Sequence, residues 1–151
     1  MLLNWKNSRS EAPTVALAPL GQNQLYLTKF KKDETLLARE KPAFIQALGM
    51  KAEPPANYKR SDYVRWIKQY GPLWVTLDAA WQGGVFSPHA VILTEVRGEE
   101  GDEEGTGTVV EMVDPATGGV EVMSWWEFVD LFEQVARDSR GELFVQVVHW
   151  V

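Results

Sequence analysis

Two side chains in the middle of the sequence, His89 and Asp114, are of the types that act together in nucleophilic catalysis. His89 follows a proline and opens an apolar run, whereas Asp114 ends the next apolar run and precedes Pro115. A neutral imidazole takes up a proton near physiological pH, and a neighbouring carboxylate fixes the orientation of its ring. The pattern therefore predicts a general base and its orienting residue, which are two of the three groups of a nucleophilic triad.

Both residues also have a purely structural interpretation. His89 fits a buried histidine that only satisfies its hydrogen bonds, and Asp114 before proline fits a residue that only starts a turn. Their places, at the start of one predicted strand and the end of the next, favour the triad. His149, in the last apolar run with Gln146 and Trp150, is expected to be an edge or packing residue.

The third group of the triad is missing from the sequence. There is no cysteine among the 151 residues, which excludes a thiol nucleophile, a disulfide and a thiolate metal site within them. Ser8, Ser10 and Ser87 are weak substitutes. None of them stands in a G-x-S-x-G motif or at a recognisable helix start beside a base.

Two glycine-bearing segments could suggest ligand sites, but both are better explained as turns. The acidic segment 98–107 (GEEGDEEGTG) lacks the ligand spacing of a calcium loop and predicts a solvated hairpin tip. The isolated pair at 83–84 is too short for a phosphate-binding loop and predicts a flexible turn. We therefore expect neither a metal nor a cofactor.

The bulk properties limit the class of protein. A chain of 151 residues with 45% hydrophobic residues is expected to form a single globular domain over 1–151. Its net charge of −6 argues against nucleic acid as a partner. It has no apolar run of membrane-spanning length, and its first residues do not form a signal peptide, so we expect no membrane association and a cytoplasmic location by default.

The elements that must position these residues follow from apolar runs and turn signals. The sequence predicts a sheet after the first helices, and the Pro54-Pro55 pair makes 50–58 extended. The expected strands lie at 72–78, 89–97, 107–114, near 120–123 and at 143–150, and the expected helices at 10–20, 25–30, 42–49, 61–70 and 124–138. The fold class is therefore α+β, with short N-terminal helices packed on an antiparallel sheet and one helix in the C-terminal half.

Capping signals mark the starts of the two longest helices. Ser61 and Asp62 are expected to cap the helix that ends at Gly71. Ser124 and Glu127 have the spacing of a capping box. The aromatic pair at 125–126 fits either a substrate cleft or packing in the first turn.

Several segments, taken together and in order, resemble the bacterial papain-like cysteine peptidases. These segments are AFIQALGMKAEPPANY, YGPLWV, HAVILTEV, VDPATGG, MSWWEFVDLFEQVARD and QVVHW. The resemblance implies a papain-like fold and peptide-bond hydrolysis, with His89 as the base and Asp114 as the orienting residue. It implies a peptide or protein as substrate or partner.

The resemblance also implies where the nucleophile belongs. In that family the cysteine opens the first helix in a Cys-Trp-Ala-Ala-like stretch, a few residues after an oxyanion-hole glutamine. MLLNWKN resembles the end of this helix, so Met1 lies about two helical turns beyond the place of the cysteine. We therefore expect a chain truncated relative to the family and inactive alone. Its vacant slot against the sheet would invite a partner or self-association.

A second interpretation belongs to another class of protein. The same scaffold could be a non-catalytic module that binds a peptide or a protein, as a pseudo-peptidase, an adaptor or an immunity-type protein. Fold alone does not decide between the two, because function depends on the site.

Overall fold

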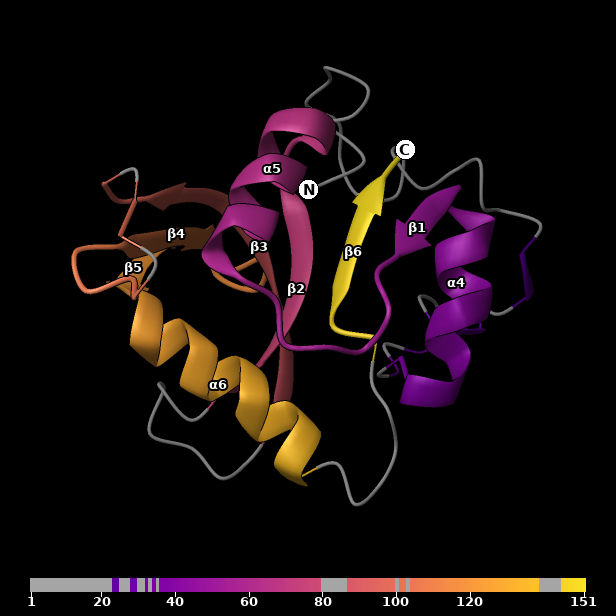
Figure 1. Cartoon of the computed structure of the whole chain (residues 1–151). Coiled ribbons are helices and arrows are strands. Elements are labelled where there is room, and N and C mark those ends of the chain that lie inside the picture. The colour runs from indigo at the N-terminus through magenta and orange to yellow at the C-terminus, as the bar shows by residue number, and fades with distance from the viewer. Residues whose placement is uncertain are drawn as a thin grey trace.

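The computed structural model describes residues 36–79, 87–99, 101–102, 104–138 and 145–151, together with 23, 24, 28, 29, 32 and 34. Within this part of the chain, helices surround a six-stranded antiparallel sheet with the strand order β1-β6-β2-β3-β4-β5 (Figure 1). In chain order the elements are η2 (Ala38–Glu40), α4 (Lys41–Ala47), β1 (Met50–Ala52), α5 (Arg60–Tyr70), β2 (Leu73–Asp78), β3 (Pro88–Arg97), β4 (Val109–Val113), β5 (Val120–Ser124), α6 (Trp125–Asp138) and β6 (Val147–Trp150).

The predicted α+β class, with an antiparallel sheet and a helix in the C-terminal half, is confirmed. The helix expected at 10–20 lies outside the described residues, and so do most of 25–30 and the start of the strand expected at 143–150. Residues 50–52, expected only to be extended, are a true strand, because β1 pairs with β6.

The last strand of the chain lies inside the sheet. β6 pairs with β1 on one side and with β2 on the other, where Val148 is opposite Trp74 and Val147 is opposite Val75. The C-terminal residues thus join the N-terminal edge of the sheet to its centre. All four residues of β6 are buried, as expected of an internal strand.

One apolar cluster lies between the sheet and the helices α5 and α6. The inward rows of β2, β3 and β4 contribute to it, and both helices contact these strands. Tyr63 lies at its centre, with ring contacts to Trp66, Trp125, Phe128 and Phe132 at centroid distances of 5.3–6.3 Å. The cluster fixes the two helices on the sheet that carries the candidate site.

The helix starts match the predicted capping signals with one shift. The Ser124 hydroxyl accepts the Glu127 amide hydrogen at 3.2 Å, as the capping box predicts. The other helix begins one residue before the predicted start: Lys59 is its N-cap, and its amide donates to Asp62 Oδ2 at 3.1 Å. Ser61 therefore lies within the first turn and does not cap the helix. Asp62 contributes to the cap by accepting the Lys59 amide hydrogen, near the positive end of the helix dipole.

None of the helices that the structure describes is both long enough and apolar enough to span a bilayer.

Candidate active site

Strand register brings His89 and Asp114 to the same end of the sheet. His89 is the second residue of β3 and lies opposite Leu77 of β2. Asp114 directly follows β4, whose last residue, Val113, is opposite Ile92. Because side chains alternate along a strand, His89 continues the buried row of Val91 on β3.

The two side chains are in direct contact. His89 Nε2 lies 2.9 Å from Asp114 Oδ1, which is a hydrogen-bond distance. The Asp114 side chain is only 5% exposed, whereas that of His89 is 26% exposed. The carboxylate is therefore almost completely buried, whereas part of the imidazole is open to solvent.

A tight turn fixes the carboxylate. Asp114 Oδ1 also accepts the Ala116 amide hydrogen at 2.8 Å. The Asp114 amide donates to the Gly119 carbonyl at 3.0 Å, and the Asp114 carbonyl accepts from the Gly118 amide at 2.7 Å. Gly118 has a φ of +74°, a conformation that favours glycine. Asp114 thus starts the turn and also contacts His89, and its role as the orienting residue of a base stays a prediction.

The contact also assigns the ring nitrogens. An ionised carboxylate can only accept, so the proton between the two groups lies on Nε2. In the neutral ring Nδ1 is then the acceptor, and it is the atom that would take a proton from a nucleophile. This order of groups is what a base and its orienting residue require.

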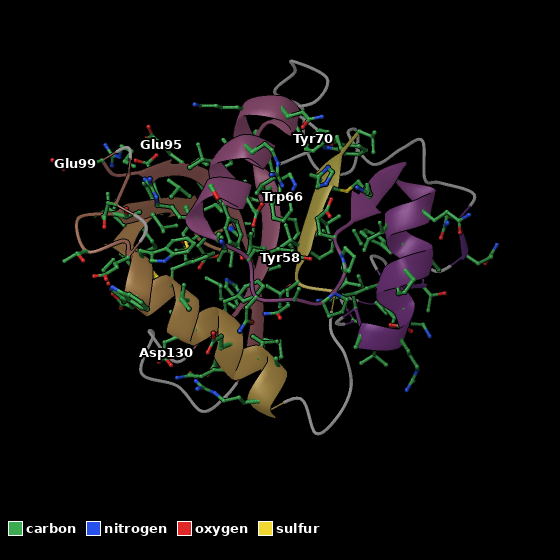
Figure 2. All side chains as sticks on the ribbon, in the orientation of Figure 1. Tyr58, Trp66, Tyr70, Glu95, Glu99 and Asp130 are labelled. Atoms are coloured by element: carbon green, nitrogen blue, oxygen red, sulfur yellow. The ribbon has the colours of Figure 1, made fainter. Side chains whose placement is uncertain are left out.

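His149 has a different environment. It is fully buried in β6 and stacks on Tyr70, with ring centroids 4.0 Å apart; Figure 2 shows Tyr70 and Trp66 of α5 in this region. Its Nδ1 is 2.7 Å from the Trp150 carbonyl, and its Nε2 is 2.8 Å from Glu53 Oε1. Both nitrogens meet protein acceptors, so the structure gives His149 a packing role.

Glu53 and Lys41 are polar residues that sequence reasoning missed. Glu53 reaches His149 because β1 pairs with β6, a contact across 96 positions of sequence. Lys41 is buried at the start of α4, where its Nζ donates to Thr76 Oγ1 at 3.1 Å, and burial lowers its pKa to about 8. A lysine before Pro42 at a helix start gives no sequence signal of burial.

A cavity of about 540 Å³ adjoins the start of β3. Ser87, Pro88 and Ala90, which flank the histidine in sequence, line it together with Lys41 and Trp74. This volume is in the range of pockets that hold small ligands or side chains. Ala90 and Trp74 face the opposite side of the sheet from His89, so the cavity lies across the sheet from the imidazole.

The other candidates of the sequence contribute turns. Of the three serines, only Ser87 lies within the described residues, and its amide donates to Asp78 Oδ1 at 3.0 Å. In the acidic segment, the Asp102 carboxylate closes the turn by accepting the Gly107 amide hydrogen. This hydrogen bond lowers the pKa of Asp102. The pair at 83–84 lies outside the described residues. Among the described residues, no cluster of three or more potential metal ligands occurs.

One protein family matches most of the chain. The family model described as papain-like cysteine protease AvrRpt2 matches residues 1–133, which include both His89 and Asp114. The chain belongs to the papain-like cysteine protease AvrRpt2 family. No curated protein and no solved structure matches it.

Membership in the AvrRpt2 family confirms the resemblance to papain-like cysteine peptidases. The match begins at the first residue and ends within α6. The 151 residues nevertheless contain no cysteine, so the family's thiol is not among them. The structure therefore presents a histidine–carboxylate contact in a chain whose 151 residues contain no thiol.

Proposed function

We propose that this chain carries the base half of a papain-like cysteine peptidase site. His89 is the general base, Asp114 orients it, and the thiol nucleophile comes from a segment outside these 151 residues. The observation that carries the proposal is the 2.9 Å contact between His89 Nε2 and Asp114 Oδ1 in a member of this family.

The proposed reaction uses the ring nitrogen that does not face the carboxylate. His89 Nδ1 takes the proton of the incoming thiol, and the thiolate attacks the carbonyl carbon of the peptide bond. The resulting imidazolium, stabilised by Asp114, gives its proton to the leaving amine as the carbon–nitrogen bond breaks. Water then hydrolyses the thioester to release the acid and regenerate the thiol.

The surroundings of the pair support a site assembled from more than these residues. The His89 side chain is 26% exposed, so it can exchange protons with a group brought beside it.

Complementation in trans tests the proposal. A synthetic helix carrying a Cys-Trp-Ala-Ala stretch is added to the chain, and hydrolysis of a fluorogenic peptide library is followed. We expect hydrolysis that needs both components and the thiol. His89→Ala should lower the rate about 10²–10⁴-fold, because proton transfer is lost. Asp114→Asn should lower it by at least about tenfold through misorientation of the ring.

The controls separate chemistry from folding. Asp130→Asn changes an exposed aspartate of α6 and should leave the rate unchanged. A Cys→Ser helix should bind equally but give no hydrolysis. Hydrolysis that persists in the His89→Ala variant would contradict the assignment of the base.

The second candidate is a non-catalytic module that binds a peptide or protein, which the lack of any cysteine in the 151 residues favours. It predicts that the helix, or a library peptide, binds without hydrolysis under every condition above. The chain could also self-associate through the surface where the missing helix would pack against the sheet, and sedimentation of the chain alone tests this expectation.

A further inference from the structure

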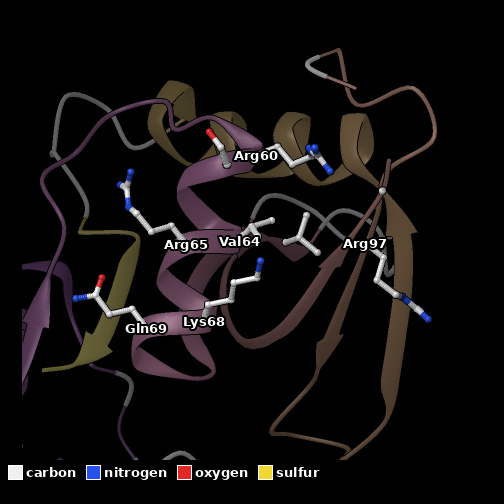
Figure 3. A pocket seen from close by; sticks show the side chains of 9 residues that line it. Arg60, Val64, Arg65, Lys68, Gln69 and Arg97 are labelled. Atoms are coloured by element: carbon white, nitrogen blue, oxygen red, sulfur yellow. The ribbon is translucent and has the colours of Figure 1, made fainter. Parts of the chain in front are cut away.

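A groove of about 850 Å³ lies between α5 and the end of β3 (Figure 3). We call it the α5–β3 groove. Its described lining contains four cations and no carboxylate, although the whole chain has a net charge of −6. The cations are Arg60, Arg65, Lys68 and Arg97.

The floor of the α5–β3 groove is apolar. Val64 of α5 and Val96 of β3 are half-buried and line it. Figure 3 shows Lys68 extending from α5 into the space beside Val64, whereas Arg65 and Arg97 point to opposite sides. A ligand in the groove would therefore meet an apolar strip with the Lys68 ammonium beside it.

The end of the groove is shaped by the close approach of Gly98 to Thr108 and Arg60. A Cβ on Gly98 would collide with Thr108 Oγ1 and would lie 3.0 Å from Arg60 Nη1. Glycine here lets the Arg60 guanidinium lie across the end of β3, where its Nη2 donates to the Glu99 carbonyl at 2.9 Å. That acceptor is uncharged, although Arg60 also interacts electrostatically with Asp102 and helps to lower the pKa of Asp102.

The cations of the groove are available to a ligand, because their ion pairs within the chain are exposed and weak. Arg65 pairs with Asp62, and Arg97 pairs with both Glu95 and Glu111, but the arginine side chains are 61% and 51% exposed. Such exposed pairs contribute only about 0–1 kcal/mol. Within the part of the chain that the structure describes, Lys68 has no ion pair and lies exposed on α5.

We propose that the α5–β3 groove binds an acidic peptide segment of another protein, with one apolar side chain seated between Val64 and Val96. Charge complementarity selects the acidic residues, and the apolar floor selects a peptide over a nucleic acid. The groove lies beyond the proposed peptidase site: His89 and Arg97 are eight residues apart on β3, about 26 Å in an extended strand.

Fluorescence anisotropy with the full chain tests this binding. The probe is a labelled eight-residue peptide of glutamate and aspartate around one central leucine. We expect saturable binding that weakens with added salt, as exposed charge contacts do. Lys68→Glu should weaken binding at least fivefold, and replacing the leucine of the probe by serine should also weaken it.

Arg137→Glu is the matched control, because it makes the same charge change on an exposed arginine of α6 and should alter binding less than twofold. Circular dichroism of each variant verifies folding. Equal losses in the two variants, tighter binding of an oligonucleotide or of a basic peptide, or no binding of the acidic probe would each overturn the proposal. A dimer that Lys68→Glu dissociates would instead assign the groove to a second copy of the chain.

Discussion

His89 and His149 each lie within 2.9 Å of a carboxylate oxygen, yet their surroundings differ. The His149 side chain is fully buried and has a protein acceptor at each nitrogen, whereas that of His89 is 26% exposed. Proton transfer to a substrate requires an accessible ring nitrogen. Of the two, His89 therefore fits the requirement for proton transfer better. His149 instead packs β6 against Tyr70 of α5.

Glu53 provides a test of this structural pair. Burial opposes its ionisation, but hydrogen bonds from His149 and Lys51 lower the pKa of Glu53 below its ordinary value of 4.5. A carboxyl with a lowered pKa stabilises the fold above its unfolded pKa, and this stabilisation is lost as the pH falls through the lowered value. Glu53→Gln should therefore reduce the free energy of unfolding by about 1–3 kcal/mol at pH 7.

The difference between wild type and Glu53→Gln should shrink as the pH falls through the lowered pKa of Glu53, because the carboxyl group itself then becomes neutral. Urea unfolding at pH 7, 5 and 3.5 measures it. Glu121→Gln, on an exposed glutamate of β5, should change stability by less than about 0.5 kcal/mol at each pH. A pH-independent loss at Glu53 would show that the carboxylate charge is not what His149 requires.

Sequence position was enough to predict that His89 and Asp114 meet, because both flank strands that are neighbours along the chain. Their catalytic role stays a prediction. The partner of His149 could not be predicted, since Glu53 reaches it only through the pairing of β1 with β6. Local patterns contain no information on that long-range register.

At the scale of elements, the hairpin between β3 and β4 packs against the start of α6. Gly105 has a φ of +71°, and a Cβ there would overlap the Trp125 ring. Composition predicted only a solvated tip for this acidic segment, and Glu99, Gly101 and Glu104 are indeed exposed. Gly105, by contrast, is buried, because the indole lies against it.

Gly105→Ala should therefore lower the free energy of unfolding by about 2–4 kcal/mol, which combines backbone strain with overpacking against the indole. Gly101→Ala is the matched control: its φ is +97°, but nothing lies within 4 Å of the added Cβ. This control should cost only about 1–2 kcal/mol of backbone strain. Chemical denaturation measures both, and equal losses would contradict the role assigned to the Trp125 contact.

Most element boundaries follow from local signals. Pro42, Gly71 and the Ser124 cap place three helix ends within two residues of the observed bounds. The strand order does not follow from them, because β6 is inserted between β1 and β2 by tertiary pairing. Sequence reasoning thus identified most of the described helices and strands, although not β1, and the order of the strands in the sheet required the structure.

At the scale of the whole molecule, the two candidate surfaces lie at opposite ends of β3. The histidine–carboxylate pair is at its start and the α5–β3 groove at its end. Between them lies the apolar cluster under α5 and α6, the two helices that Figure 1 shows in front of the sheet. A well-packed core of this kind holds both surfaces in a fixed relation.

Tyr63 tests whether the cluster unites the fold. Its ring is 1% exposed and contacts aromatic residues of α5 and α6. Tyr63→Ala should lower the free energy of unfolding by about 3–5 kcal/mol, and Tyr63→Phe by less than about 1.5 kcal/mol because the ring volume is kept. Tryptophan fluorescence and far-UV circular dichroism should give the same midpoint in each variant, as expected of one cooperative domain. Separate midpoints would mean that α5 and α6 do not unfold together, and the sheet could not then hold the histidine and the groove as one unit.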